Sequence, residues 1–140
     1  MVDNFTFELL GVQEHMAALK VTARSPLANV VTEIQAEDSV MRELQDTITE
    51  FLSESDLETY WESDIPGLGA SPCITLRLLP GSSEEAVLAE VYLELDDGSD
   101  FSRHTCCFYV RTDREQLMRF GSGIAELFTA APGTILALNP

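Results

Sequence analysis

The sequence predicts an α+β fold in which one antiparallel sheet of about six strands carries two helices on one face. Three observations lead to this prediction: segments with alternating apolar residues dominate, two segments change to a helical period, and the order of segments repeats. The connections are short, which favours antiparallel neighbours. A length of 140 residues fits one domain, 1–140, and the hydrophobic content of 45% is enough for a buried core.

The first half of the chain contains three predicted strands followed by a helix. In FTFELL, Phe5, Phe7 and Leu9 share one face, and alternation continues in HMAALKVTA and ANVVTEIQA. The segment EDSVMRELQDTITEFL instead places an apolar residue every three or four positions, which predicts an amphipathic helix. Its apolar stripe consists of Met41, Leu44, Ile48, Phe51 and Leu52.

The same order of elements begins again after the glycine- and proline-rich segment IPGLGASP. CITLRLLP and AVLAEVYLEL are predicted strands, DDGSD is a predicted hairpin turn, and RHTCCFYVR is the next strand. A second helix is predicted to begin at TDRE, where Thr112 and Glu115 form a capping-box pattern. Gly121 and Gly123 lie within this helix, where they permit close packing or a kink.

A shift of 76 residues aligns the two halves, 1–59 and 70–131. We interpret this match as an internal duplication of a strand-strand-strand-helix unit. Neither unit alone would bury its sheet face well, so we expect the two units to share one sheet. The shift places the apolar stripe of the first helix on Leu117, Phe120, Ile124, Leu127 and Phe128.

The charge of the chain makes nucleic acid an unfavourable partner. The formal net charge is -16, from 24 Asp and Glu against 8 Lys and Arg. Binding to DNA or RNA needs cations that displace counterions from phosphates, and an anionic membrane surface repels this chain for the same reason. A basic protein would instead be attracted.

The sequence also favours a cytoplasmic location. The N-terminus has no cationic stretch followed by a long apolar run, and no apolar run approaches the roughly 20 residues of a membrane span. Cys73, Cys106 and Cys107 are an odd number of cysteines, for which reduced thiols are the simplest interpretation.

Acidic residues are concentrated between positions 37 and 64, around Tyr60 and Trp61. On the first helix they line the side opposite the apolar stripe, although like charges four residues apart weaken a helix slightly. Large aromatic rings with a polar tip are common interface anchors, and carboxylates around them would steer a cationic partner. The predicted partner-binding residues are Glu43, Asp46, Glu50, Glu54, Asp56, Glu58, Tyr60, Trp61, Glu62 and Asp64.

Two simpler interpretations of this segment remain open. A solvated face that keeps the chain soluble explains the acidic stripe equally well. In addition, the segment could fold back so that Tyr60 and Trp61 cap the open edge of the core.

The sequence contains no convincing catalytic, metal or cofactor pattern. His15 and His104 lie in strand-like segments, without a nucleophile at a spacing known from catalytic sites. The histidines and cysteines lack metal-ligand spacing, DDGSD does not keep the alternating positions of an EF-hand loop, and no glycine-rich phosphate loop follows a strand. We therefore expect no enzyme, no cofactor and no metal.

Four segments carry a resemblance to a known family: FTFELL, VTARSPLANVVTEIQAEDSVMRELQDTITEFL, ITLRLLP and FYVRTDREQLMRFGSGIAELF. Their order resembles that of WapI-type bacterial immunity proteins, which neutralise toxin domains delivered by polymorphic toxin systems. The resemblance covers most of the chain and implies a non-enzymatic cytoplasmic inhibitor of a toxin domain such as a nuclease. The alternative is a small-molecule or regulatory binding module that uses the sheet face.

Overall fold

The computed structural model describes residues 3–53, 58–64, 73–96 and 103–140. The strands and helices within these residues follow one another in two similar series. In chain order they are β1 (Asn4–Gln13), β2 (Met16–Arg24), β3 (Asn29–Glu37), α1 (Asp38–Ser53), β4 (Thr59–Glu62), β5 (Cys73–Pro80), β6 (Ala86–Asp96), β7 (Arg103–Asp113), α2 (Arg114–Leu127) and β8 (Ile135–Ala137).

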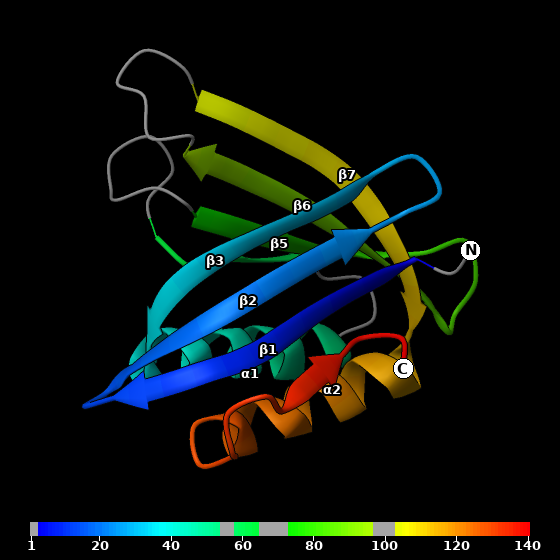
Figure 1. Ribbon diagram of the computed structural model, residues 1–140. Helices are drawn as coiled ribbons and strands as arrows, with labels where there is room; N and C mark the ends of the chain where they lie inside the picture. The colour runs from blue at the N-terminus through cyan, green and yellow to red at the C-terminus, as the bar shows by residue number, and fades with distance from the viewer. Residues whose placement is uncertain (1–2, 54–57, 65–72, 97–102) are drawn as a thin grey trace.

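The strands form two antiparallel four-stranded sheets, so the prediction of a single six-stranded sheet was wrong. The first sheet has the order β3-β2-β1-β8, and the second has the order β4-β5-β6-β7. The sequence analysis missed β4 and β8. Each of these short strands follows a helix and pairs with the first strand of the other series, β4 with β5 and β8 with β1. Figure 1 shows the sheets as two layers with both helices along one side.

The hydrophobic core lies between the two sheets and the two helices. The first sheet contributes Phe5, Phe7 and Leu9 from β1, and the second contributes alternate residues of β6 such as Val91 and Leu93. Each sheet therefore buries one face in this shared core, which the other sheet and the two helices cover. The predicted apolar stripes of the helices face the core. Leu52 and Phe128 are partly buried and pack against it. The other predicted residues, Met41, Leu44, Ile48, Phe51, Leu117, Phe120, Ile124 and Leu127, are buried.

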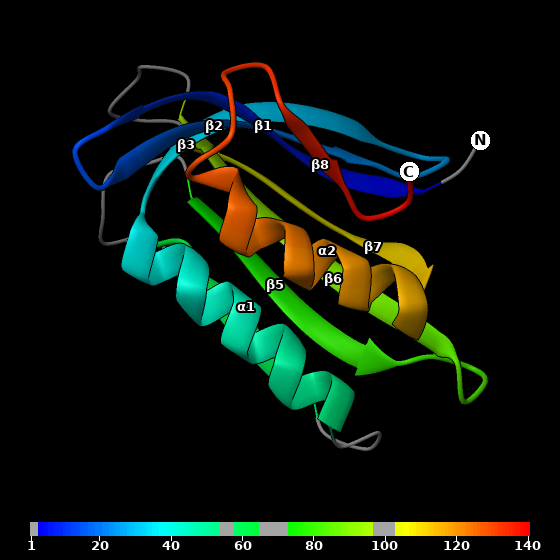
Figure 2. The same cartoon turned by 90° about the horizontal axis from the view of Figure 1, so that it is seen from below.

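The two helices lie side by side, as Figure 2 shows from below. Their close approach depends on glycine: a Cβ added to Gly121 would lie 3.0 Å from Cγ2 of Ile48 on α1. A Cβ on Gly123 would lie only 2.4 Å from Cδ1 of Leu136 on β8. Of the two roles predicted for these glycines, close packing is therefore the one observed.

The N-terminus of α2 differs from the predicted capping box. The N-cap is Asp113, whose carboxylate accepts a hydrogen bond from the backbone N–H of Gln116 at 2.8 Å. The hydroxyl of Thr112 instead donates to Oδ1 of Asn139 at 2.7 Å. The reason is that β7 continues through Asp113, so the helix begins at Arg114.

Two other sequence expectations concern the hairpin turn and membrane spans. Most of the DDGSD turn falls in 97–102, outside the described residues, although β6 and β7 pair antiparallel on either side of it.

In the described part of the chain, neither helix combines the length and the apolarity that crossing a membrane requires.

Candidate functional site

The outer face of α1 carries three exposed carboxylates. Glu43, Asp46 and Glu50 are spaced three and four residues apart, so they follow one line along the helix. Because the apolar stripe of α1 faces the core, this line necessarily faces away from it.

The adjoining strand β4 separates Tyr60 from Trp61. Trp61 lies opposite Leu76 of β5 and points into the core, whereas Tyr60 lies opposite Arg77 and points outward. Trp61 is only 3% exposed, and its indole Nε1 donates to the carbonyl oxygen of Val40 at 2.9 Å. The expectation of Trp61 as a surface anchor is therefore corrected, since its ring closes the core against α1. Tyr60 is 53% exposed and is available to a partner.

The line of carboxylates on α1 and strand β4 enclose a groove of about 400 Å³, which we call the acidic groove. Four carboxylates line it, and none of its lining residues is basic. Thr47, which the sequence analysis did not select, is also part of the wall. Its position on the same helical face as Glu43 and Glu50 is the signal that would have identified it. The lining residues are Glu43, Asp46, Thr47, Glu50, Tyr60, Trp61 and Glu62.

The corresponding junction in the second half, between α2 and β8, differs in packing and charge. There Gly123 lets Leu136 approach the helix closely, so an apolar contact brings α2 and β8 together. The surface of α2 presents an exposed ion pair between Arg119 and Glu115, with an N–O distance of 2.6 Å, instead of a line of carboxylates. The concentration of acidic groups is thus a property of the first junction.

The remaining predicted partner-binding residues are not all brought to this groove. Glu58 is exposed, but its carboxylate pairs with Nη1 of Arg77 at 3.1 Å, on the outer face of the second sheet. Asp64 is exposed and lies just beyond the end of β4. Glu54 and Asp56 lie outside the described residues.

The hydroxyl of Tyr60 donates a hydrogen bond of 2.9 Å to Oε2 of Glu62 at the groove. Partial burial raises the pKa of Tyr60, and the Glu62 carboxylate raises it further. The phenol therefore remains protonated at neutral pH and keeps donating, which holds the Glu62 side chain in place.

The histidines and cysteines of the described residues do not gather with acidic side chains into a metal site. No group of three or more His, Cys, Asp or Glu side chains in those ranges could hold a metal ion. Both histidines were predicted to lie in strands. His104 does lie in β7, but His15 lies in the turn between β1 and β2. The three thiols are free, and burial raises the pKa of Cys73 to about 11.

The alternative of a binding module on the sheet face has two candidate hollows on the first sheet. The larger, of about 670 Å³, is lined by side chains of β1, β2 and β3 that include Leu10, Met16 and Ala18. A depression of about 240 Å³ lies over the outer face of the first sheet, among polar side chains such as Thr6, Lys20 and Thr22. The larger hollow falls within the usual size range of small-molecule sites, whereas the smaller one lies below it.

The chain matches no protein-family model, no curated protein and no solved structure. The shape and charge of the acidic groove are therefore the basis of the functional proposal.

Proposed function

We propose that this chain is a non-enzymatic binding protein that recognises a basic protein partner through the acidic groove. The observation that carries the proposal is the convergence of four carboxylates, with no basic residue among the lining side chains, from two elements that are separate in sequence. Three carboxylates come from α1 and one, Glu62, comes from β4.

The groove suits lysine or arginine side chains of a partner. A guanidinium group binds carboxylates through two parallel hydrogen bonds, and adjacent carboxylates such as Asp46 and Glu50 offer several acceptors. The exposed ring of Tyr60 supplies apolar contact area beside these acceptors, and tyrosine is a frequent energetic anchor of interfaces. The net charge of -16 would accelerate the encounter with such a partner at low salt.

The resemblance to WapI-type immunity proteins suggests that the partner is a toxin domain, such as a nuclease, in a bacterial cytoplasm. A nuclease surface that binds nucleic acid is basic, so it would complement the groove. A cytoplasmic location agrees with three free thiols in the folded chain. The proposal includes no cofactor, no nucleic acid and no membrane as partners.

We also propose that the two halves arose by duplication and then diverged in function. One observation that supports this is that α1 begins at Asp38 and α2 at Arg114, which are separated by the same 76 residues as the shift in the sequence. Another is that β4 and β8 occupy equivalent places, because each follows a helix and joins the sheet of the other half. Only the α1–β4 junction became acidic. After the duplication, the first half would therefore bind the partner, and the second half would contribute to the fold alone.

The direct test is association with the polypeptide encoded by the gene immediately upstream, measured by surface plasmon resonance at low and high salt. The variant reverses Glu43, Asp46 and Glu50 to lysine. Its matched control reverses Glu33, Glu84 and Glu85 to lysine. These residues are also exposed and do not line the groove, and both variants change the net charge by the same amount.

The groove variant should associate about tenfold more slowly and lose most of the salt dependence, whereas the control should change little. Equal slowing by both variants would mean that net charge alone attracts the partner. That result, or a groove variant that binds as the natural chain does, would contradict the proposal.

A further inference from the structure

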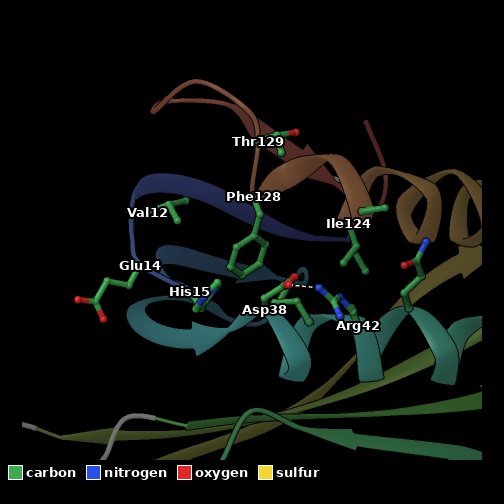
Figure 3. A pocket seen from close by; sticks show the side chains of 11 residues that line it. Val12, Glu14, His15, Asp38, Arg42, Ile124, Phe128 and Thr129 are labelled. Atoms are coloured by element: carbon green, nitrogen blue, oxygen red, sulfur yellow. Dashed lines mark hydrogen bonds and ion pairs between the residues drawn. The ribbon is translucent and has the colours of Figure 1, made fainter.

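Another cavity, of about 400 Å³, lies between the N-terminal part of α1 and the C-terminal part of α2, and we call it the helix slot. The β1–β2 turn closes one end of it. Figure 3 shows the ring of Phe128 and the side chain of Ile124 on the α2 side, facing Asp38 and Arg42 of α1. One wall of the slot is therefore apolar and the opposite wall is charged.

The charged wall offers both signs of charge. Arg42 and Asp38 form an ion pair one helical turn apart, and the Arg42 side chain is 71% exposed. Exposed pairs of this kind contribute little to stability, so their groups can exchange partners at small cost. Glu115 and Arg119 form a similar pair on α2, but they do not line the slot.

The β1–β2 turn at the mouth of the slot adds two polar side chains, those of Glu14 and His15. Glu14 has a φ of 59°, and it is the one residue other than glycine with positive φ in the described part of the chain. This conformation is the one that a two-residue hairpin turn between the paired residues Gln13 and Met16 requires. The neighbouring His15 faces the slot, and its imidazole hydrogen-bonds to no group of the described residues.

We propose that the helix slot binds a free amino acid with an apolar side chain. The carboxylate of the ligand would bind Arg42 and His15, its ammonium group would bind Asp38, and its side chain would lie against Phe128 and Ile124. A zwitterion can pair with both charged residues of the wall, Arg42 and Asp38, at the same time. A simple carboxylate would enter against the net charge of -16, and a simple amine would leave Arg42 without a ligand group. The site is separate from the acidic groove and does not depend on the proposed function.

The test uses L-phenylalanine, phenethylamine and 3-phenylpropionate, which share the phenyl group and differ in charge. Each is titrated into the ¹⁵N-labelled chain and followed by NMR. L-phenylalanine should bind with saturation, and its shifts should be centred on residues 12–15, 38–45 and 124–129. The amine and the carboxylate should each bind at least about tenfold more weakly, because each loses one charge-assisted contact.

Two variants locate the site. Arg42→Gln should weaken the binding of L-phenylalanine about tenfold, whereas Arg119→Gln, which disrupts the matching exposed pair on α2, should leave it unchanged. Both residues are exposed, so neither change should prevent folding. The proposal is overturned by an absence of saturable binding up to about 10 mM. Equal affinity for all three compounds, or equal effects of the two variants, would overturn it as well.

Discussion

The carboxylate of Asp3 accepts hydrogen bonds from the backbone N–H of Arg111 at 3.0 Å and from its Nε at 2.9 Å. Asp3 precedes β1 in the first sheet, and Arg111 belongs to β7 in the second, so the pair joins the two layers. The side-chain amide of Asn139 reinforces the junction by donating to the carbonyl oxygens of Asp3 and Arg111 at 2.7 and 2.8 Å. Both ends of the chain are thus attached to the same edge strand.

Asp3→Asn should lower the free energy of unfolding by about 2 kcal/mol at pH 7, because Asp3 is buried and loses its charged hydrogen bonds. Hydrogen bonds from the Arg111 side chain hold the pKa of Asp3 below its ordinary value of 3.8. A lowered pKa stabilises the fold above the unfolded value and ceases to do so as the pH falls through the folded value. Urea titrations should therefore show the difference from the natural chain shrinking below about pH 4. A difference that is the same at pH 7 and pH 2 would be incompatible with this role.

Trp61→Ala should lower the free energy of unfolding by about 3 kcal/mol, because it removes a large buried ring and the hydrogen bond to Val40. Trp61→Phe retains most of the apolar volume and should cost less. Tyr60→Ala, the adjacent change on the exposed side of β4, should stay within about 0.5 kcal/mol. Denaturant midpoints of the three variants provide the measurement, and similar losses for Tyr60→Ala and Trp61→Ala would argue against the inward orientation of Trp61.

Asp46→Lys should raise the free energy of unfolding by about 0.5 kcal/mol, because it replaces repulsion by Glu43 and Glu50 with two favourable helical pairs. Glu84→Lys, in the turn before β6, removes the same charge without such neighbours on a helix. The comparison is made by urea denaturation at low salt. A gain that Glu84→Lys reproduces would come from net charge and not from crowding of the carboxylates on α1.

Cys73 should react with iodoacetamide at pH 8 about 100-fold more slowly in the folded chain than in the unfolded chain. Burial, followed by the neighbouring Glu94 carboxylate, raises the pKa of Cys73 to about 11 from an ordinary 9.0, so little thiolate is present. Cys107 is exposed, and its pKa is also raised by partial desolvation, so its labelling measures the effect of pKa with less steric protection. Mass spectrometry of labelled peptides would separate the sites. Fast labelling of Cys73 in the folded chain would contradict the burial of its thiol.

The candidate site could be predicted from the sequence only in part. The positions of Glu43, Asp46 and Glu50 on one exposed line follow from helical spacing, and the concentration of acids around Tyr60 is visible in the sequence. The opposite orientations of Tyr60 and Trp61 were not predictable, because TYWE is only four residues long and its pairing register with β5 decides which ring points inward. The helix slot was also unpredictable, since His15, Asp38 and Phe128 meet only when the two helices pack.

By itself, the sequence determined the local elements: the period of apolar residues along α1 and α2, and the alternation along strands such as β5, which spans the predicted residues 73–80. These are local properties, because each depends on the spacing of residues within one turn or one strand. The tertiary structure alone decided the division into two sheets. That division depends on β8 pairing with β1, where Ala137 lies opposite Thr6, and on β4 pairing with β5. Pairing between such distant or short segments is selected by the burial of both sheet faces together, and no local pattern records it.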